Sequence, residues 1–188
     1  MNNNADYVTA GKPKKGGAIY RAPLGTVLPT NALDDLDEAF VNVGYISEDG
    51  LTNSNSPESD DIKAWGGDTV LALQTAKPDT FKFGMIEAMN TEALSTVYGP
   101  ENVSGNLTDG ITVVANSNDM KEYAYVIEMS LKNNVVKRVV IPDAKITNID
   151  DITYKDGAAV AYVITLTAIP DIENNTHYEY IVQGMVSA

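Results

Sequence analysis

The chain has 188 residues, 44% of them hydrophobic and 21% charged, which suits one globular domain with a sizeable core. It contains no cysteine, so disulfides, thiolate metal sites and cysteine nucleophiles are excluded. A formal net charge of −13 argues against a conventional nucleic-acid binder, whose affinity comes mainly from cations on phosphates. The charge fits either an ordinary acidic protein or a surface that repels a polyanion.

The N-terminal segment 1–17 is polar and locally basic, with Lys12, Lys14 and Lys15 between asparagines and glycines. We expect a flexible arm, either solvated or docked onto an acidic neighbouring subunit. The three lysines have no interleaved aromatics, so they do not indicate a nucleic-acid site. No signal peptide is visible, and no window has the roughly 18 consecutive apolar residues of a membrane helix. We expect no membrane association.

A first strand is predicted over residues 18–22, ending at Pro23. Residues 33–40 are acidic and fit either a single helical turn or a loop, and a strand follows near 41–46. Residues 47–61 then show neither a period of 2 nor one of 3.6. We predict a long polar loop over 47–66, of a kind that is usually functional or ordered by a partner.

The middle of the chain contains the clearest helix signal. Asn90 is a suitable N-cap and Gly99-Pro100 a stop, which predicts a helix over residues 91–98. Before the helix, a short strand at 62–65 and a turn at Gly66-Gly67 lead into two further strands, over residues 69–75 and 80–87.

The C-terminal half predicts strand after strand, over residues 123–131, 135–141, 146–154, 160–166 and 178–182. Asn133-Asn134 fits the two-residue turn of a hairpin, because Asn tolerates positive φ. Alternation places Glu128 on a partly wet face. We therefore predict a mainly β fold over 18–188, an antiparallel β-sandwich or barrel with one short α-helix, a long polar loop and the N-terminal arm.

No catalytic equipment is apparent. The one histidine, His177, has no nucleophile motif to support it, and adjacent acids such as Asp150 and Asp151 point to opposite faces of a strand. Calcium-binding and phosphate-binding loop motifs are absent. We expect no enzyme activity, no cofactor and no metal.

Two stretches carry a family resemblance: Gly44-Tyr45-Ile46-Ser47-Glu48-Asp49-Gly50-Leu51 and Asp60-Asp61-Ile62-Lys63-Ala64-Trp65-Gly66-Gly67. Their order and spacing resemble the tail tube, or major tail, proteins of siphophages. The predicted helix and its exit also fit the layout of that family.

The resemblance implies a structural virion protein, assembled in the host cytoplasm into a homo-oligomer of hexameric rings. The rings stack into a tail tube around a tape measure protein, between the tail terminator and distal tail proteins. DNA passes through the lumen without specific binding. The expected contacts between subunits or rings lie in the long loop, at Glu48, Asp49, Leu51, Asn53, Asn55, Glu58, Asp60, Asp61, Ile62 and Trp65.

Three expectations about assembly follow. Trp65 is the anchor of an interface or, equally well, a core residue. Glu128 is a candidate lumen residue. Ordering a loose arm and loop costs roughly 1–2 kcal/mol per residue in backbone entropy, which predicts a protein that stays monomeric until nucleated.

Other functions remain open at this point. A capsid decoration or other adhesive β-sandwich explains the composition equally well. A carbohydrate-binding module would use the ten tyrosines as an aromatic platform. The tube of a contractile tail is a further possibility.

Overall fold

A computed structural model describes residues 3–184. Thirteen strands, one α-helix and three 3₁₀ turns (η) follow one another along this part of the chain. In order they are η1 (Ala5–Tyr7), β1 (Lys12–Pro13), β2 (Ile19–Pro23), β3 (Val41–Asn42), β4 (Ile46–Asn55), β5 (Glu58–Lys63), β6 (Thr69–Ala76), β7 (Asp79–Met85), α1 (Thr91–Tyr98), η2 (Pro100–Asn102), β8 (Val103–Asn106), β9 (Gly110–Val113), β10 (Glu122–Ser130), η3 (Lys132–Asn134), β11 (Val135–Ile149), β12 (Tyr162–Ala168) and β13 (Tyr178–Gln183).

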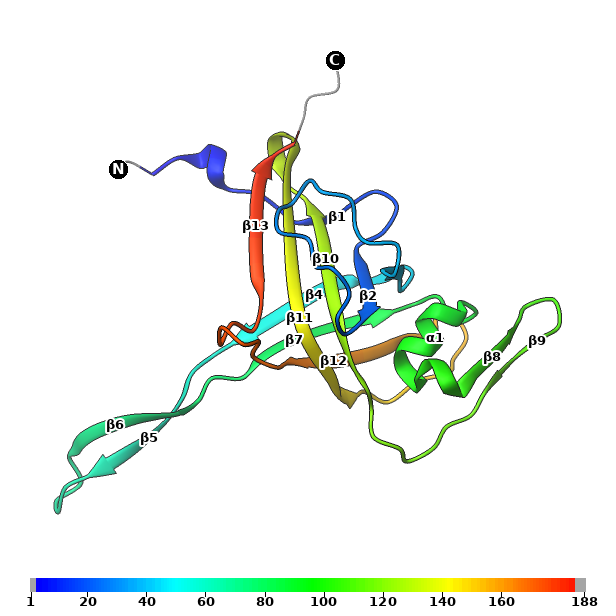
Figure 1. Ribbon diagram of the computed structural model, residues 1–188. Coiled ribbons are helices and arrows are strands. Elements are labelled where there is room, and N and C mark those ends of the chain that lie inside the picture. Colours follow the sequence, from blue (N-terminus) through cyan, green and yellow to red (C-terminus); the bar gives the residue numbers. More distant parts are fainter. Residues whose placement is uncertain (1–2, 185–188) are drawn as a thin grey trace.

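Nine of the strands form one antiparallel sheet. Its order is β3-β2-β10-β11-β12-β7-β4, with β1 paired to β10 and β13 paired to β11. In Figure 1 the strands β2, β10, β11 and β13 stand upright, whereas β4, β7 and β12 cross them obliquely. The sheet thus folds over into two layers. The predicted fold class, a mainly β antiparallel sandwich with one α-helix, is confirmed.

Strand β11 joins the two layers. Its residues 135–140 pair with β13, and its residues 144–149 pair with β12. Pro142 lies between these stretches, opposite a register shift in β10, where its missing N–H is tolerated. The sequence predicted two strands here, and the second was expected to reach Tyr154. The structure has one bent strand that ends at Ile149.

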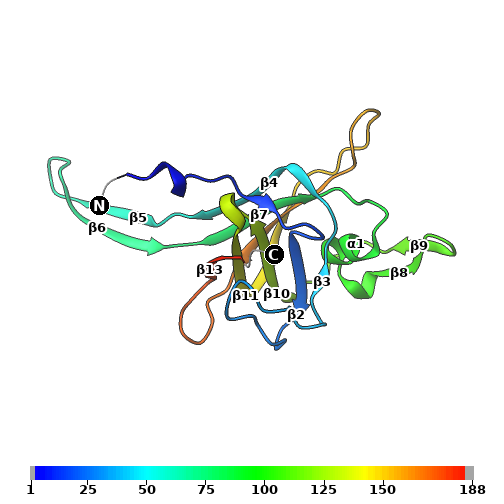
Figure 2. The ribbon, with the colours of Figure 1, turned by 90° about the horizontal axis from the view of Figure 1, so that it is seen from above.

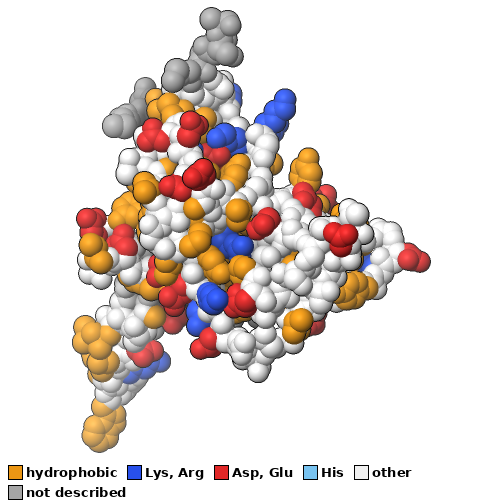
Figure 3. Space-filling model, turned by 45° about the vertical axis from the view of Figure 1, so that its right-hand side comes forward, with side chains coloured by type: hydrophobic (Ala, Val, Ile, Leu, Met, Phe, Trp, Pro, Cys, Tyr) orange, Lys and Arg blue, Asp and Glu red, His pale blue; other side chains and the backbone are white. Residues whose placement is uncertain are grey.

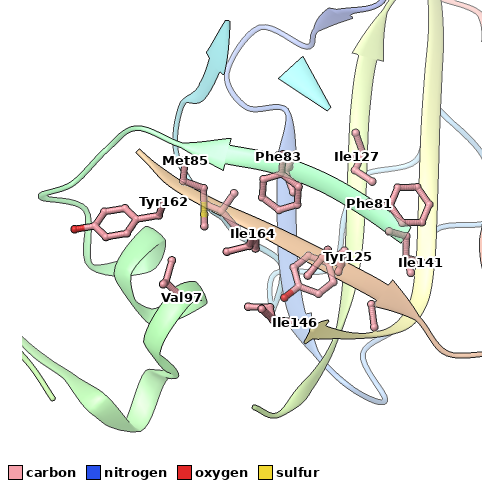
Figure 4. Packing of buried hydrophobic residues seen from close by; sticks show 14 of the residues in the cluster. Phe81, Phe83, Met85, Val97, Tyr125, Ile127, Ile141, Ile146, Tyr162 and Ile164 are labelled. Atoms are coloured by element: carbon pink, nitrogen blue, oxygen red, sulfur yellow. The ribbon is translucent and has the colours of Figure 1, made fainter. Parts of the chain in front are cut away.

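The space between the layers holds the main hydrophobic core. Phe81, Phe83 and Met85 of β7 meet side chains from β10, β11, β12 and α1 (Figure 4). Burying each large apolar side chain contributes about 1.5–3 kcal/mol. In β12 the buried side chains alternate with half-buried ones, as in a strand with one face on the core.

Helix α1 closes one end of this core with Ala93, Leu94 and Val97. The Asn90 side chain accepts a hydrogen bond from the Glu92 N–H at 2.9 Å, and Gly99 ends the helix at φ 90°. The predicted helix, its N-cap and its stop are all confirmed.

The second face of β10 is also buried. Ala124, Val126 and Val140 form a smaller cluster with Phe40, which lies in the segment that crosses this face. The acidic stretch 33–40 within that segment forms turns and bends, so it is a loop and not a helical turn. This cover overturns the expectation that β10 has a partly wet face.

The segment 47–66 differs most from its prediction. The expected loop is in fact the rest of β4, all of β5 and part of a tight turn. Strands β4 and β5 pair with β7 and β6, so the ladder satisfies their backbone groups although their side chains are mostly polar and exposed. Figures 1 and 2 show β5 and β6 projecting from the body; we call residues 58–76 the hairpin arm.

Two shorter features complete the fold. The hairpin β8–β9, next to α1, was not predicted from the sequence. The turn before β11 was predicted: Asn133 and Asn134 both have positive φ, at 58° and 60°.

Candidate assembly interface

The hairpin arm exposes both of its faces. Every residue of β5 and β6 is exposed, including the apolar residues Ile62, Val70, Leu71 and Leu73. Ile62 lies opposite Leu71, and Asp60 lies opposite Leu73, so these side chains share one face. Figure 3 shows hydrophobic side chains gathered on this projection. A two-stranded hairpin without a packed face is marginally stable in water, so a second surface would stabilise it.

The tip of the hairpin arm presents Trp65. The Ala64 N–H donates to the Asp68 carbonyl at 2.8 Å, and the Gly67 N–H donates to the Ala64 carbonyl at 3.0 Å. Gly66 and Gly67 adopt φ values of 119° and 98°, which glycine reaches without strain. Trp65 is fully exposed on this closed turn. The alternative that Trp65 packs in the core is therefore wrong.

The residues predicted as loop contacts divide between the hairpin arm and strand β4. Glu58, Asp60, Asp61, Ile62 and Trp65 lie on the hairpin arm or its tip. The other five are in β4, at Glu48, Asp49, Leu51, Asn53 and Asn55. Among these, Leu51 packs against the main core, and Asn53 binds Asp79 and the Thr80 carbonyl.

The sequence interpretation missed the apolar half of the arm. Val70, Leu71 and Leu73 were assigned to a strand over 69–75, whereas most of its partner strand β5 was read as part of the loop 47–66. The available signal was the consecutive pair Val70-Leu71. It puts apolar side chains on both faces, whereas a half-buried strand alternates.

A buried carboxylate fixes the root of the arm. Asp79, at the start of β7, accepts hydrogen bonds from Thr176 Oγ1 at 2.6 Å and Asn53 Nδ2 at 2.8 Å. His177 Nδ1 lies 2.5 Å from Asp79 Oδ2. Burial alone would raise the pKa of Asp79, but the hydrogen bonds from Thr176, Asn53 and His177 outweigh it, so the pKa lies below its ordinary value. His177 thus clamps the segment before β13 to the arm's root.

The N-terminal arm lies along its own subunit. Lys12 and Pro13 form β1 on the edge of β10, and the Lys14 ammonium lies 2.8 Å from the Glu128 carboxylate. The Lys132 N–H donates to Thr9 Oγ1 at 2.7 Å. The described part of this arm is therefore docked within the monomer, although it is largely exposed and Lys15 faces solvent.

Glu128 is buried, which corrects its candidacy as a lumen residue. It and Arg138 are each only 1% exposed, because the segment that crosses β10 covers both. Arg138 pairs with Glu128 and donates at 2.8 Å to the carbonyls of Asn31 and Asp34. The pair is a structural lock between β10, β11 and the covering segment, and it does not line a channel.

Four strands of the main sheet have an unpaired edge within residues 3–184. Strands β1, β3, β4 and β13 each pair with one neighbour in this sheet. In β13 the apolar residues Ile181 and Val182 are exposed. Such edges are templates for strands of another chain, and closure of a ring removes them.

A pocket of about 180 Å³ lies between the C-terminal end of α1 and residues 115–121. Val97, Met120 and Tyr123 contribute to its apolar wall. Asn118, Asp119 and Lys121 also line it.

Residues 3–184 hold no group of three or more histidine or acidic side chains that could bind a metal ion. None of the helices in this range has the length and apolar character needed to cross a membrane.

Comparison with known proteins assigns the chain to a family. A family model of phage tail tube proteins matches residues 1–188, the whole sequence. The search of curated proteins found no match. The chain therefore belongs to the phage tail tube protein family, and it is a structural component of the phage tail that assembles into the tail tube.

Proposed function

We propose that six copies of this chain form a ring and that the rings stack into the tube of a non-contractile phage tail, through which DNA passes. The hairpin arm carries this proposal. It extends away from the body, is exposed on both faces and bears Trp65 at its tip. Tryptophan is enriched among residues that dominate interface energetics. A neighbouring subunit or ring would cover the arm.

The open edges of β3, β4 and β13 suit contacts within a ring, where each subunit would complete the sheet of the next. Contacts of this kind usually bury on the order of 1,600 Å² in total. The expected further partners are a tape measure protein inside the tube and the tail terminator and distal tail proteins at its ends.

The role of the tube is passive. A net charge of −13 per subunit would prevent DNA phosphates from being held by ion pairs, so the duplex would slide. We infer that the chain is non-catalytic. The family assignment favours this role over a capsid decoration or a carbohydrate-binding module.

Negative-stain micrographs of the concentrated protein test the proposal. We expect hollow tubes with six-fold symmetry in end views. Trp65→Ala should fold as a monomer, by circular dichroism, and form no tubes. Ile172→Ala is a matched control, because Ile172 is equally exposed but lies elsewhere; it should form tubes. Single particles at every concentration would contradict the tube, and tubes of Trp65→Ala would contradict the role of the arm.

A further inference from the structure

The hairpin arm and the pocket beside α1 lie on opposite sides of the molecule. Figures 1 and 2 show this in two perpendicular views: β5 and β6 project to one side, whereas α1 lies on the other with β8 and β9. The arm of one copy therefore cannot reach its own pocket. It can reach the pocket of another copy in a head-to-tail contact, the type of contact that generates rings and stacks.

The pocket has the size of an aromatic side chain. Its volume is about 180 Å³. A protein cavity of about 150 Å³ accommodates benzene, so this pocket has room for a larger aromatic group. Val97 is in its wall, and Met120 supplies a flexible thioether that packs well against aromatic rings.

Trp65 is the large aromatic side chain that the arm offers. It is fully exposed, and the hydrogen-bonded turn 64–68 holds it at the end of the arm. An indole typically buries 150–250 Å² when it is covered, and its N–H needs a hydrogen-bond acceptor. The pocket lining provides side-chain oxygens for that purpose at Asn116, Asn118 and Asp119.

Charges on the two surfaces complement each other. Lys63 precedes Trp65 by two residues and Asp68 follows it by three. In the pocket lining, Asp119 and Lys121 flank Met120, and Lys121 lies 3.1 Å from Glu101. Lys121 is already paired with Glu101, whereas Lys63 has an opposite charge, Asp119, at the pocket. Such pairing fixes register between two copies whose net charges repel.

We propose that the pocket between α1 and residues 115–121 receives the Trp65 indole from the hairpin arm of a second copy. This inference rests on the proposed tube and names the surface that the arm contacts within it. It makes Trp65 and Met120 partners across the contact between subunits.

Intrinsic fluorescence tests the proposal directly, because Trp65 is the chain's one tryptophan. Its emission should move to shorter wavelength when monomers assemble into tubes. Ala115→Phe would fill the pocket from an exposed position. It should fold normally but lose either the tubes or the spectral shift. Ala158→Phe makes the same change at an exposed position outside the pocket lining and should retain both.

Cross-linking gives a second readout in a cysteine-free chain. Ala64→Cys at the arm tip and Asn118→Cys at the pocket are mixed, assembled and mildly oxidised, and the linked peptides are identified by mass spectrometry. We expect a disulfide between these two variants. Ala64→Cys mixed with Glu173→Cys, an exposed site elsewhere, should give none.

The outcomes separate this inference from the proposed function. Two results would overturn the pocket contact and leave the tube intact. One is wild-type tubes with unshifted Trp65 emission. The other is a disulfide from Ala64→Cys to Glu173→Cys and none to Asn118→Cys. Absence of wild-type tubes in micrographs would overturn both.

Discussion

His177 Nδ1 lies 2.5 Å from Asp79 Oδ2, and this contact joins the segment before the last strand to the root of the hairpin arm. Asp79 is buried at the start of β7, where Asn53 of β4 and Thr176 also bind its carboxylate. One side chain thus connects both strands at the root with the segment before β13.

Replacing Asp79 should destabilise the protein. Asp79→Asn keeps the size of the side chain but removes the charge and one acceptor, so a partly buried donor from Thr176 or His177 loses its partner. We expect the free energy of unfolding to fall by about 1–3 kcal/mol, measured by urea denaturation of the monomer. Asp156→Asn, on an exposed turn, should change it by less than about 0.5 kcal/mol. Equal effects of the two substitutions would contradict the clamp.

The same carboxylate makes stability depend on pH. Because the pKa of Asp79 is lowered in the folded protein, its contribution is fully present above the unfolded-state pKa of about 3.9 and is lost as the pH falls through the folded value. The wild type should therefore lose more stability than Asp79→Asn when the pH is lowered from about 6 to about 3. Denaturation curves of both proteins across this range provide the measurement. A constant difference between them would show that the Asp79 charge is not involved.

Breaking the Arg138–Glu128 pair should lower the free energy of unfolding far more than breaking the neighbouring Lys137–Glu179 pair. Arg138→Leu leaves the Glu128 carboxylate buried without its main partner and frees the segment at Asn31 and Asp34. The expected loss is about 3–5 kcal/mol in the free energy of unfolding. Lys137→Leu is the matched control: Lys137 pairs with Glu179 at a more exposed site, so its loss should be about 0–1 kcal/mol. Similar losses would contradict a buried lock.

Much of the body was predictable because local signals agree with its tertiary packing. Asn90 and Gly99 mark the two ends of α1. Successive residues of β12 are alternately buried and half-buried. The errors arose where the tertiary structure determines the length of a strand or the burial of a side chain. The sequence interpretation ended a strand before Pro142, but the bend of β11 places this proline where no ladder bond is needed. Glu128 was assigned to a wet face because no local pattern shows that a segment about 100 residues earlier in the chain covers β10.

The hairpin arm could be located but not recognised as a hairpin. Its importance was evident from the Asp60–Gly67 stretch. Its conformation was not, because periodicity arises from burial on one face and the arm buries neither face. A strand whose partner surface lies on another molecule has no such signal in its own sequence. The pocket beside α1 is assembled from α1, β10, β11 and the 115–121 segment, so it is visible only in three dimensions.

Salt should promote assembly. The hairpin arm is a paired ladder and not a loose loop, so ordering it on assembly costs less backbone entropy. Repulsion between copies with a net charge of −13 remains to oppose association. Raising the ionic strength from about 0.01 M to 0.1 M shortens the Debye length from about 30 Å to 10 Å. We therefore expect the concentration at which tubes first sediment to fall across this range. Trp65→Ala should remain unassembled throughout, which separates tube formation from non-specific aggregation. A rise in the onset concentration with salt would show instead that ion pairs between subunits outweigh the repulsion.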